Sequence, residues 1–112
     1  MTKERDSKIA ACIWAVPKGK VASYGQIADL AGIKRGHRVV CRFLREHDDP
    51  ELPWYRILRA DGKIGMEPGS DGYHAQVEQL TAEGVLILNH RIDMKRYQWQ
   101  PGLDFLLFHP DL

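Results

Sequence analysis

The sequence has few cysteines and no long hydrophobic run. Both thiols, Cys12 and Cys41, lie in a chain whose charged N-terminus lacks the apolar segment that directs secretion, so we expect them to be reduced. No apolar run approaches the roughly 18 residues that a membrane-spanning helix needs. The sequence therefore predicts neither a membrane protein nor a secreted scaffold held by disulfides.

Metal-binding spacing is also absent. The 5 histidines are scattered, and neither they nor the cysteines show the C-x-x-C or H-x-x-x-H spacing of zinc sites, so we expect no metal and no cofactor. At 112 residues, with 44% hydrophobic and 28% charged residues, the chain has the size and composition of an ordinary globular domain. We predict a single domain over residues 1–112, without repeats or a linker.

The net charge is only +1, which argues against strong non-specific binding to nucleic acid. The charges are nevertheless unevenly distributed. Acidic residues concentrate in 46–51 and 78–83, whereas residues 34–45 contain no acid. That stretch carries Lys34, Arg35, His37, Arg38, Arg42 and Arg45. Such polarity is typical of a surface that faces anions.

Apolar residues recur at three- and four-residue spacing in four stretches. They predict helices over 3–16, 24–31, 34–46 and 73–83. Ser23 is placed to cap the second helix, and Gly32 and Gly84 stand where the second and fourth helices end. The short second and third helices, joined by a tight turn, are typical of a helix-turn-helix.

The predicted third helix has an apolar face and a basic face. The apolar face contains Val39, Val40, Phe43 and Leu44, and the basic face contains Arg35, Arg38, Arg42 and Arg45. A basic second helix in a helix-turn-helix indicates a contact with nucleic acid. The alternative is a charged face that is only solvated, and the pattern alone does not decide between the two.

The rest of the chain predicts little β structure. Residues 55–58 read as a strand, Asp61-Gly62 as a hairpin turn and 63–65 as the return strand. Residues 66–72 predict a loop, and 85–88 predict a strand or an extended segment. The tail from residue 89 to 112 is ambiguous, and we expect it to pack on the domain through Tyr97, Trp99 and Phe105 or to be partly flexible. The predicted fold class is mainly α with a small β-hairpin.

Four features in order carry a family resemblance: Val16 to Ala28 (VPKGKVASYGQIA), Arg38, Pro53 to Leu58 (PWYRIL) and Asp61 to Gly65 (DGKIG). Over residues of about 5–88 the chain resembles the DNA-binding domain of the O6-alkylguanine-DNA alkyltransferases. It is still more similar to the alkyltransferase-like proteins, in which Trp replaces Cys in the Pro-Cys-His-Arg motif. The resemblance implies a winged helix-turn-helix-like domain, as in the C-terminal domain of the alkyltransferases.

The same resemblance implies how DNA is read. The second helix of the motif enters the minor groove, and the damaged base is extruded into a pocket while Arg38 fills the gap in the duplex. The implied DNA contacts are Tyr24, Arg35, Arg38 and Arg42, and the implied lesion pocket is Tyr24, Pro53, Trp54, Tyr55 and Arg56. The alternatives are a phosphate contact or a solvated charge for Arg38, packing on the hairpin for Tyr24 and a core position for Trp54. Arg56 is expected to hold the pocket loop by a buried ionic or backbone hydrogen bond.

The chain departs from an alkyltransferase at the reactive position. Trp54 offers no thiolate, and Tyr55 stands where a histidine acts as general base, so we expect no catalytic residue and no enzyme activity. Cys41 has basic neighbours, but the sequence offers it no fixed histidine and we expect it to lie away from the pocket. Glu67 is unfavourable near a guanine O6 unless it points away.

The function implied is a damage sensor for duplex DNA that contains O6-alkylguanine, with nucleotide excision repair proteins as further partners. We expect a monomer without a membrane partner, located in the cytoplasm and on the nucleoid when bound to DNA, or in the nucleus if the source is eukaryotic. The alternatives are an alkyltransferase or nuclease-like enzyme with another nucleophile, and a winged-helix transcription regulator. A regulator would prefer an undamaged operator, whereas a sensor would prefer the lesion in any sequence.

Overall fold

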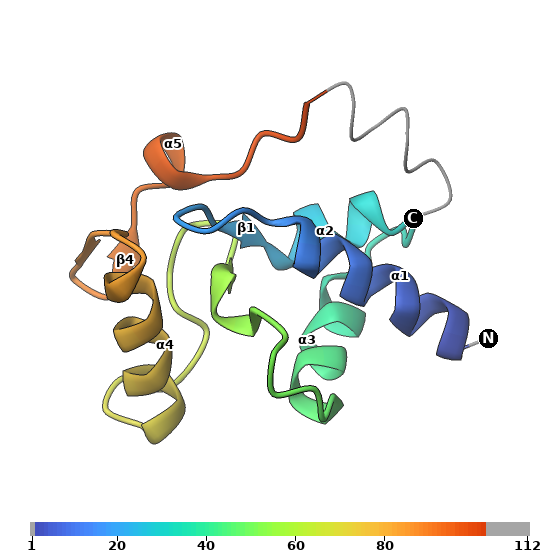
Figure 1. Ribbon diagram of the computed structural model, residues 1–112, viewed down its shortest axis with the longest axis horizontal. Coiled ribbons are helices and arrows are strands. Elements are labelled where there is room, and N and C mark those ends of the chain that lie inside the picture. Colours follow the sequence, from blue (N-terminus) through green and yellow to red (C-terminus); the bar gives the residue numbers. More distant parts are fainter. Residues whose placement is uncertain (1, 103–112) are drawn as a thin grey trace.

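A computed structural model describes residues 2–102 of the protein (Figure 1). The elements, in order, are α1 (Thr2–Ala15), β1 (Ala22–Ser23), α2 (Tyr24–Leu30), α3 (His37–Glu46), the 3-10 helix η1 (Trp54–Arg56), β2 (Ile57–Leu58), α4 (Asp71–Ala82), β3 (Ile87–Leu88), β4 (Arg91–Ile92) and α5 (Met94–Tyr97). The mainly helical fold class predicted from the sequence is confirmed. In the described part of the chain, no helix has the length and apolarity needed to cross a membrane.

The first three helices enclose one hydrophobic core. On α1, the inward residues follow the predicted spacing, and Ile9, Cys12 and Ile13 are fully buried against α2 and α3. Cys12 and Cys41 are free thiols, as predicted. Burial raises the pKa of Cys12 to about 11, so this thiol is a core residue without nucleophilic character.

Helices α2 and α3 form the predicted helix-turn-helix. The Ser23 hydroxyl accepts a hydrogen bond from the Gln26 N–H at 3.0 Å, which caps α2, and Gly32 ends the helix with a φ of +77°. Helix α3 begins three residues later than expected, because Arg35 has a left-handed backbone with a φ of +52°. Arg35 therefore lies in the turn and not on the basic face of α3, which corrects the sequence prediction.

The turn before α3 depends on a glycine for packing. A Cβ at Gly36 would lie 2.4 Å from Cγ2 of Ile33, which is closer than two carbon atoms can approach. Gly36 therefore lets the turn fold tightly onto Ile33 at the start of α3.

The predicted hairpin around Asp61-Gly62 is only partly present. Gly62 turns the chain with a φ of +87°, but the return segment does not pair with residues 57–58. Instead β2 pairs in parallel with β1, with Ala22 opposite Ile57 and Ser23 opposite Leu58. This pairing buries Ile57 and Leu58, and the preceding Tyr55 and Arg56 belong to the 3-10 helix rather than to a strand.

The two central strands separate two cores. Ala22 and Ile57 point into the core of α1, α2 and α3, whereas Val21 and Leu58 point into a second core with α4 and the C-terminal segment. Successive side chains on a strand face opposite sides, so a short parallel pair is sufficient to serve both cores. Helix α4 begins two residues before the predicted start, and Ser70 caps it by accepting from the Tyr73 N–H.

A true β-hairpin lies further along the chain than predicted. Strands β3 and β4 pair in antiparallel fashion around Asn89 and His90, whose φ values of +53° and +65° are those of a two-residue hairpin turn. His90 is also hydrogen bonded to the Tyr73 hydroxyl of α4. The turn lacks the usual glycine, which explains why the sequence pattern did not reveal it.

The segment after the hairpin packs back across the molecule, as expected for Tyr97 and Trp99. Both are 8% exposed, and the backbone of Val21 bonds to each of them. The Gln26 side chain also donates to the Trp99 carbonyl at 2.8 Å, which attaches this segment to α2. The expectation for Phe105 lies outside the described residues.

Candidate nucleic-acid interface

A hollow of about 250 Å³ lies between the helix-turn-helix and α4. Its lining consists of Tyr24, Cys41, Leu44, Arg45, Trp54, Ile57, Gly65, Met66 and Gln76. The parallel pairing of β1 with β2 creates it, because Tyr24 directly follows β1 and Trp54 lies just before β2. Helix α3 supplies the wall that carries Cys41, Leu44 and Arg45.

Tyr24 presents a neutral phenol to the hollow. Burial raises its pKa above the ordinary value of 10.0, and its hydroxyl has no hydrogen-bond partner within residues 2–102. A Cβ at Gly65 would lie 2.6 Å from that hydroxyl oxygen, so a glycine at this position is what admits the tyrosine ring. The phenol is therefore available to donate or accept a hydrogen bond beside the N-terminal end of α2.

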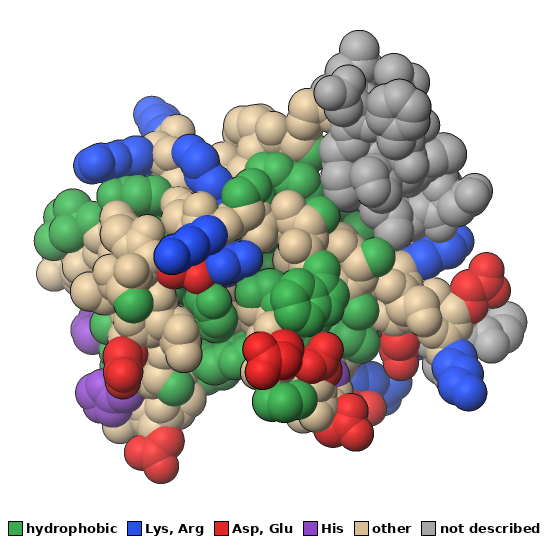
Figure 2. All heavy atoms as spheres, in the orientation of Figure 1, with side chains coloured by type: hydrophobic (Ala, Val, Ile, Leu, Met, Phe, Trp, Pro, Cys, Tyr) green, Lys and Arg blue, Asp and Glu red, His purple; other side chains and the backbone are tan. Residues whose placement is uncertain are grey.

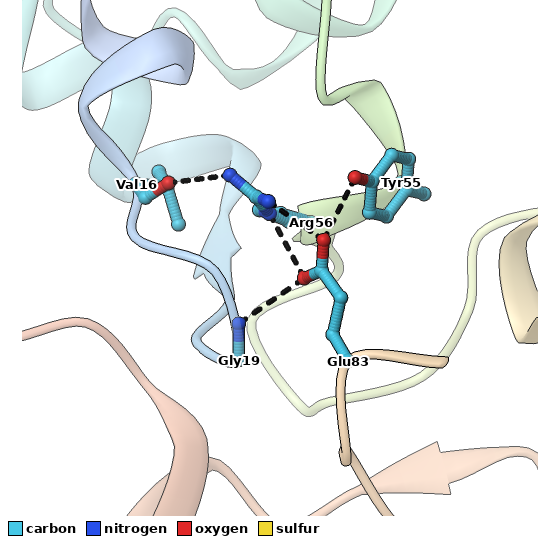
Figure 3. A network of polar contacts seen from close by, with 5 residues as sticks. All are labelled: Val16, Gly19, Tyr55, Arg56 and Glu83. Atoms are coloured by element: carbon cyan, nitrogen blue, oxygen red, sulfur yellow. Dashed lines mark hydrogen bonds and ion pairs between the residues drawn. The ribbon is translucent and has the colours of Figure 1, made fainter. Parts of the chain in front are cut away.

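Arg56 and Tyr55 do not line the hollow, and both side chains point to the carboxylate of Glu83 (Figure 3). The Arg56 guanidinium donates to the Glu83 carboxylate from Nε at 3.0 Å and from Nη2 at 2.6 Å, and its Nη1 donates to the Val16 carbonyl at 2.8 Å. The Tyr55 hydroxyl and the Gly19 N–H donate to the same carboxylate at 2.8 and 3.1 Å. We call these five residues the Glu83 network.

The electrostatics of the Glu83 network follow from its hydrogen bonds. Burial by itself would raise the pKa of Glu83, but the bonds from Arg56, Gly19 and Tyr55 hold that pKa below its ordinary value. The bonds from Arg56 to Glu83 raise the pKa of Arg56, while burial and the separate hydrogen bond from Tyr55 to Glu83 raise the pKa of Tyr55. The expectation that Arg56 holds the pocket loop through a buried ionic or backbone bond is confirmed in both forms.

The geometry thus divides the five residues expected in the lesion pocket. Tyr24 and Trp54 line the hollow together, whereas Pro53, Tyr55 and Arg56 do not. Pro53 is buried at the N-terminal end of the 3-10 helix, and the rings of Trp54 and Tyr55 meet edge to face at 86°. Successive side chains of a 3-10 helix point about 120° apart, so neighbours in this motif cannot share one wall.

The sequence analysis missed most of the residues that line the hollow, and two missed residues, Gln76 and Glu83, hold the backbone of the site. Gln76 of α4 is 2% exposed, and its side-chain amide donates to the carbonyls of Tyr55 and Ile57, which fixes the backbone that carries Trp54. Glu83 is the partner of Arg56. A buried arginine requires an acid, but the sequence contains 15 acidic residues and no local pattern distinguishes this one.

Cys41 requires a correction, because it lines the hollow rather than lying away from it. Its chemistry nevertheless disfavours attack on an alkyl group. Burial raises its pKa above the ordinary value of 9.0, although the charge of Arg45 acts in the opposite direction. The residues that line the hollow include no histidine that could take the proton.

The exposed side of α3 is basic. Arg38, Arg42 and Arg45 all extend into solvent, with Arg35 in the turn that precedes them. The ion pair between Arg42 and Glu46 is 3.6 Å long and about two-thirds exposed on both sides, so it holds neither charge firmly. Glu67 is exposed and does not line the hollow, so its charge is not directed at a base placed there.

A second hollow of about 440 Å³ adjoins the first. Leu44, Trp54 and Met66 line both hollows, so their side chains form the boundary between them. The far side of the second hollow is polar and contains His47, Asp48 and Asp49. The face in Figure 2 includes acidic side chains around the loop that follows α3, next to exposed hydrophobic side chains.

Comparison with known proteins gives a consistent result. Residues 4–85 match the family model described as 6-O-methylguanine DNA methyltransferase, DNA binding domain. A DNA base-flipping protein of Vibrio parahaemolyticus is 38% identical over 96 residues, which cover 84% of this chain and 94% of that protein. Alkyltransferase-like protein 1 of Schizosaccharomyces pombe is 29% identical over 101 residues, which cover 85% of this chain and 94% of that protein.

The fold also matches a crystal structure. S. pombe Atl1, in complex with damaged DNA containing O6-carboxymethylguanine, superposes with a TM-score of 0.81 and 28% identity over 88% of this chain and 97% of that chain. Residues 4–85, which match the family model, include the helix-turn-helix, the 3-10 helix and α4. The chain therefore belongs to the family of the 6-O-methylguanine DNA methyltransferase DNA-binding domain, as an alkyltransferase-like member with Trp54 in the position of the reactive cysteine.

Proposed function

We propose that this protein is a non-enzymatic sensor of O6-alkylguanine in duplex DNA. The basic side of α3 approaches the minor groove, Arg38 takes the place of the extruded base, and the base enters the hollow beside Trp54. The observation that carries the proposal is Trp54 itself, which lines the hollow at the point where an alkyltransferase needs a nucleophile. The two relatives named for base flipping and for alkyltransferase likeness support it.

The residues around the hollow are suited to binding without reaction. The indole of Trp54 and the apolar side chains of Leu44, Ile57 and Met66 offer contact to an alkyl group, and Tyr24 offers a hydrogen bond. Taking a base out of the stack costs roughly a few kcal/mol, which contacts of this kind and an inserted guanidinium would offset. The sensor then hands the site to nucleotide excision repair, binds as a monomer and acts in the compartment that holds the DNA; these three points rest on the family alone.

A second candidate function is alkyl transfer to Cys41, because this thiol lines the same hollow. Its raised pKa and the lack of a neighbouring histidine in that lining argue against it. Intact mass spectrometry separates the two functions. After incubation with excess O6-methylguanine duplex, the sensor keeps its mass, whereas a transferase gains one methyl group per chain.

Binding to matched duplexes with and without O6-methylguanine tests the sensor directly, and we expect preference for the lesion in any sequence. Gly65→Ala should reduce that preference by about tenfold, because its Cβ displaces the Tyr24 hydroxyl. Gly102→Ala is the matched control, since nothing lies within 4 Å of the added methyl group. Equal affinity of the unaltered protein for both duplexes contradicts the proposal.

A further inference from the structure

The β3–β4 hairpin leaves two leucines in solvent. Leu86 is 52% exposed and Leu88 is 64% exposed, while Ile87 between them packs against the second core. This alternation is the one expected for a strand with one covered face. Among residues 2–102, the outer edge of β3 has no strand partner, so its backbone is also open to pairing.

These leucines border a groove of about 370 Å³ between the hairpin and α5. Arg91 stands opposite Leu88 in the register of the two strands, and Arg96 extends from α5 with its guanidinium 5.0 Å from the centre of the Tyr97 ring. The groove therefore combines an apolar side with two cationic groups. Figure 2 shows Lys and Arg side chains gathered at this end of the molecule, beside hydrophobic ones.

The described residues offset the positive charge of the groove only in part, because Arg91 and Asp61 attract each other without forming an ion pair. Neither Arg91 nor Arg96 forms an ion pair with any described residue. The one acid in the lining, Asp93, caps α5 by accepting from the Lys95 N–H at 3.0 Å. In the adjoining turn, Asp61 bonds to the Lys63 N–H and to Arg59. Carboxylates from outside would therefore meet cations that form no ion pair within residues 2–102.

The groove is separate from the DNA-binding machinery. It shares no residue with the hollow beside Trp54, and every residue that lines it follows residue 85, where the match to the DNA-binding family model ends. In Figure 1 the hairpin and α5 lie at the opposite end of the molecule from the N-terminus of α1.

We propose that this groove docks an acidic, extended segment of another protein. Its apolar side chains cover Leu86 and Leu88, its carboxylates pair with Arg91 and Arg96, and its backbone can add to the edge of β3. DNA would use the cations but not the leucines, because phosphate contacts involve charge and hydrogen bonds. A symmetric contact with a second copy would bring like charges together.

The probe is a fluorescein-labelled peptide in which Glu and Leu alternate, titrated by fluorescence anisotropy and by amide chemical shifts. We expect saturable binding with shift changes concentrated in residues 86–97, and none for a peptide in which Lys and Leu alternate. Absence of saturable binding, or shift changes spread over α3, overturns the proposal.

Two variants and a control define the site. Leu88→Ser and Arg91→Glu alter exposed side chains and should each weaken the acidic peptide by about tenfold. Lys3→Glu makes the same change of charge as Arg91→Glu on the exposed side of α1 and should change affinity by less than about twofold. Unchanged affinity in both groove variants overturns the proposal. A loss of affinity for duplex DNA in Leu88→Ser would also overturn the proposal, because it would assign the groove to DNA. A dimer of the unaltered protein that Leu88→Ser dissociates would overturn it as well.

Discussion

At the scale of the residue, Trp54 and Tyr55 are neighbours in sequence with different surroundings. Trp54 lines the hollow, while the Tyr55 hydroxyl donates to the buried carboxylate of Glu83 at 2.8 Å. Their ring centres are only 5.9 Å apart. A nucleophile at position 54 would therefore face a flipped nucleobase. A proton acceptor at position 55 would lie beside that nucleophile and would contact the carboxylate of Glu83.

We expect Trp54→Cys to keep lesion binding but to transfer alkyl groups only in trace amounts. A thiol with a pKa of about 8.5 is mostly protonated at neutral pH. Tyr55 cannot accept the thiol proton, because burial and the bond to Glu83 raise the pKa of this phenol and keep it protonated. The double change Trp54→Cys with Tyr55→His should transfer faster, since Glu83 can orient an imidazole and stabilise its cation. Single-turnover transfer from a labelled duplex measures both rates.

The control for this prediction is Tyr55→His alone, which supplies a base but no thiol and should transfer nothing. If the single variant Trp54→Cys already reacts as fast as the double variant, position 55 supplies no catalytic base.

Arg38 is expected to act on the lesion specifically. Arg38→Ala should weaken binding to O6-methylguanine duplex by about 1–3 kcal/mol more than binding to undamaged duplex, because the extruded state loses the group that fills the gap. Arg42→Ala should weaken both duplexes alike and reduce the salt dependence, as a phosphate contact does. Titrations at two salt concentrations distinguish these patterns, and retained discrimination in Arg38→Ala would disprove the assignment.

At the scale of the element, the Glu83 network joins segments that are far apart in sequence. It connects the turn after α1 (Val16 and Gly19), the 3-10 helix (Tyr55 and Arg56) and the end of α4 (Figure 3). The Arg56 and Glu83 side chains are 13% and 7% exposed, so removing one partner leaves a charge in a poorly hydrated place. The 3-10 helix that presents Trp54 therefore depends on this pair for its position.

We expect Glu83→Gln to destabilise the fold by about 3 kcal/mol at neutral pH and to flatten its response to acid. The pKa of Glu83 is held below the ordinary 4.5, so the unfolded chain binds its proton first as pH falls. The contribution of Glu83 is thus complete above about pH 4.5 and is lost as pH falls through the lower, folded pKa. Urea unfolding at a series of pH values measures this difference, and parallel curves for the two proteins would contradict it.

At the scale of the whole molecule, two hydrophobic cores share one short parallel sheet. Val21 belongs to this junction, and its backbone receives the C-terminal segment through Tyr97 and Trp99. Trp99 packs on the first core, although it lies more than seventy residues beyond α1 in the chain. The segment after residue 93 is therefore part of the structure that supports α2, and α2 carries Tyr24 to the hollow.

Trp99→Ala should destabilise the protein by about 3–5 kcal/mol, as large-to-small changes of buried aromatic residues do. Trp14→Ala, at a tryptophan of α1 that is 51% exposed, is the matched control and should cost about 1 kcal/mol or less. Urea unfolding followed by circular dichroism measures both changes. Similar losses in the two variants would mean that the C-terminal segment contributes little to the first core.

The sequence by itself determined the four longer helices, the caps at Ser23 and Gly32 and the replacement of a nucleophile by Trp54, because each depends on a few neighbouring residues, but it did not reveal the 3-10 helix or α5. Only the tertiary structure decided which side chains line the hollow, that Arg56 pairs with Glu83 and that β2 joins β1 rather than a hairpin strand. The partners in these contacts are separated by 27 residues between Arg56 and Glu83 and by a comparable span between the strands. Such pairings depend on which charged and apolar groups are buried together when the two cores form. A local sequence pattern does not contain this information.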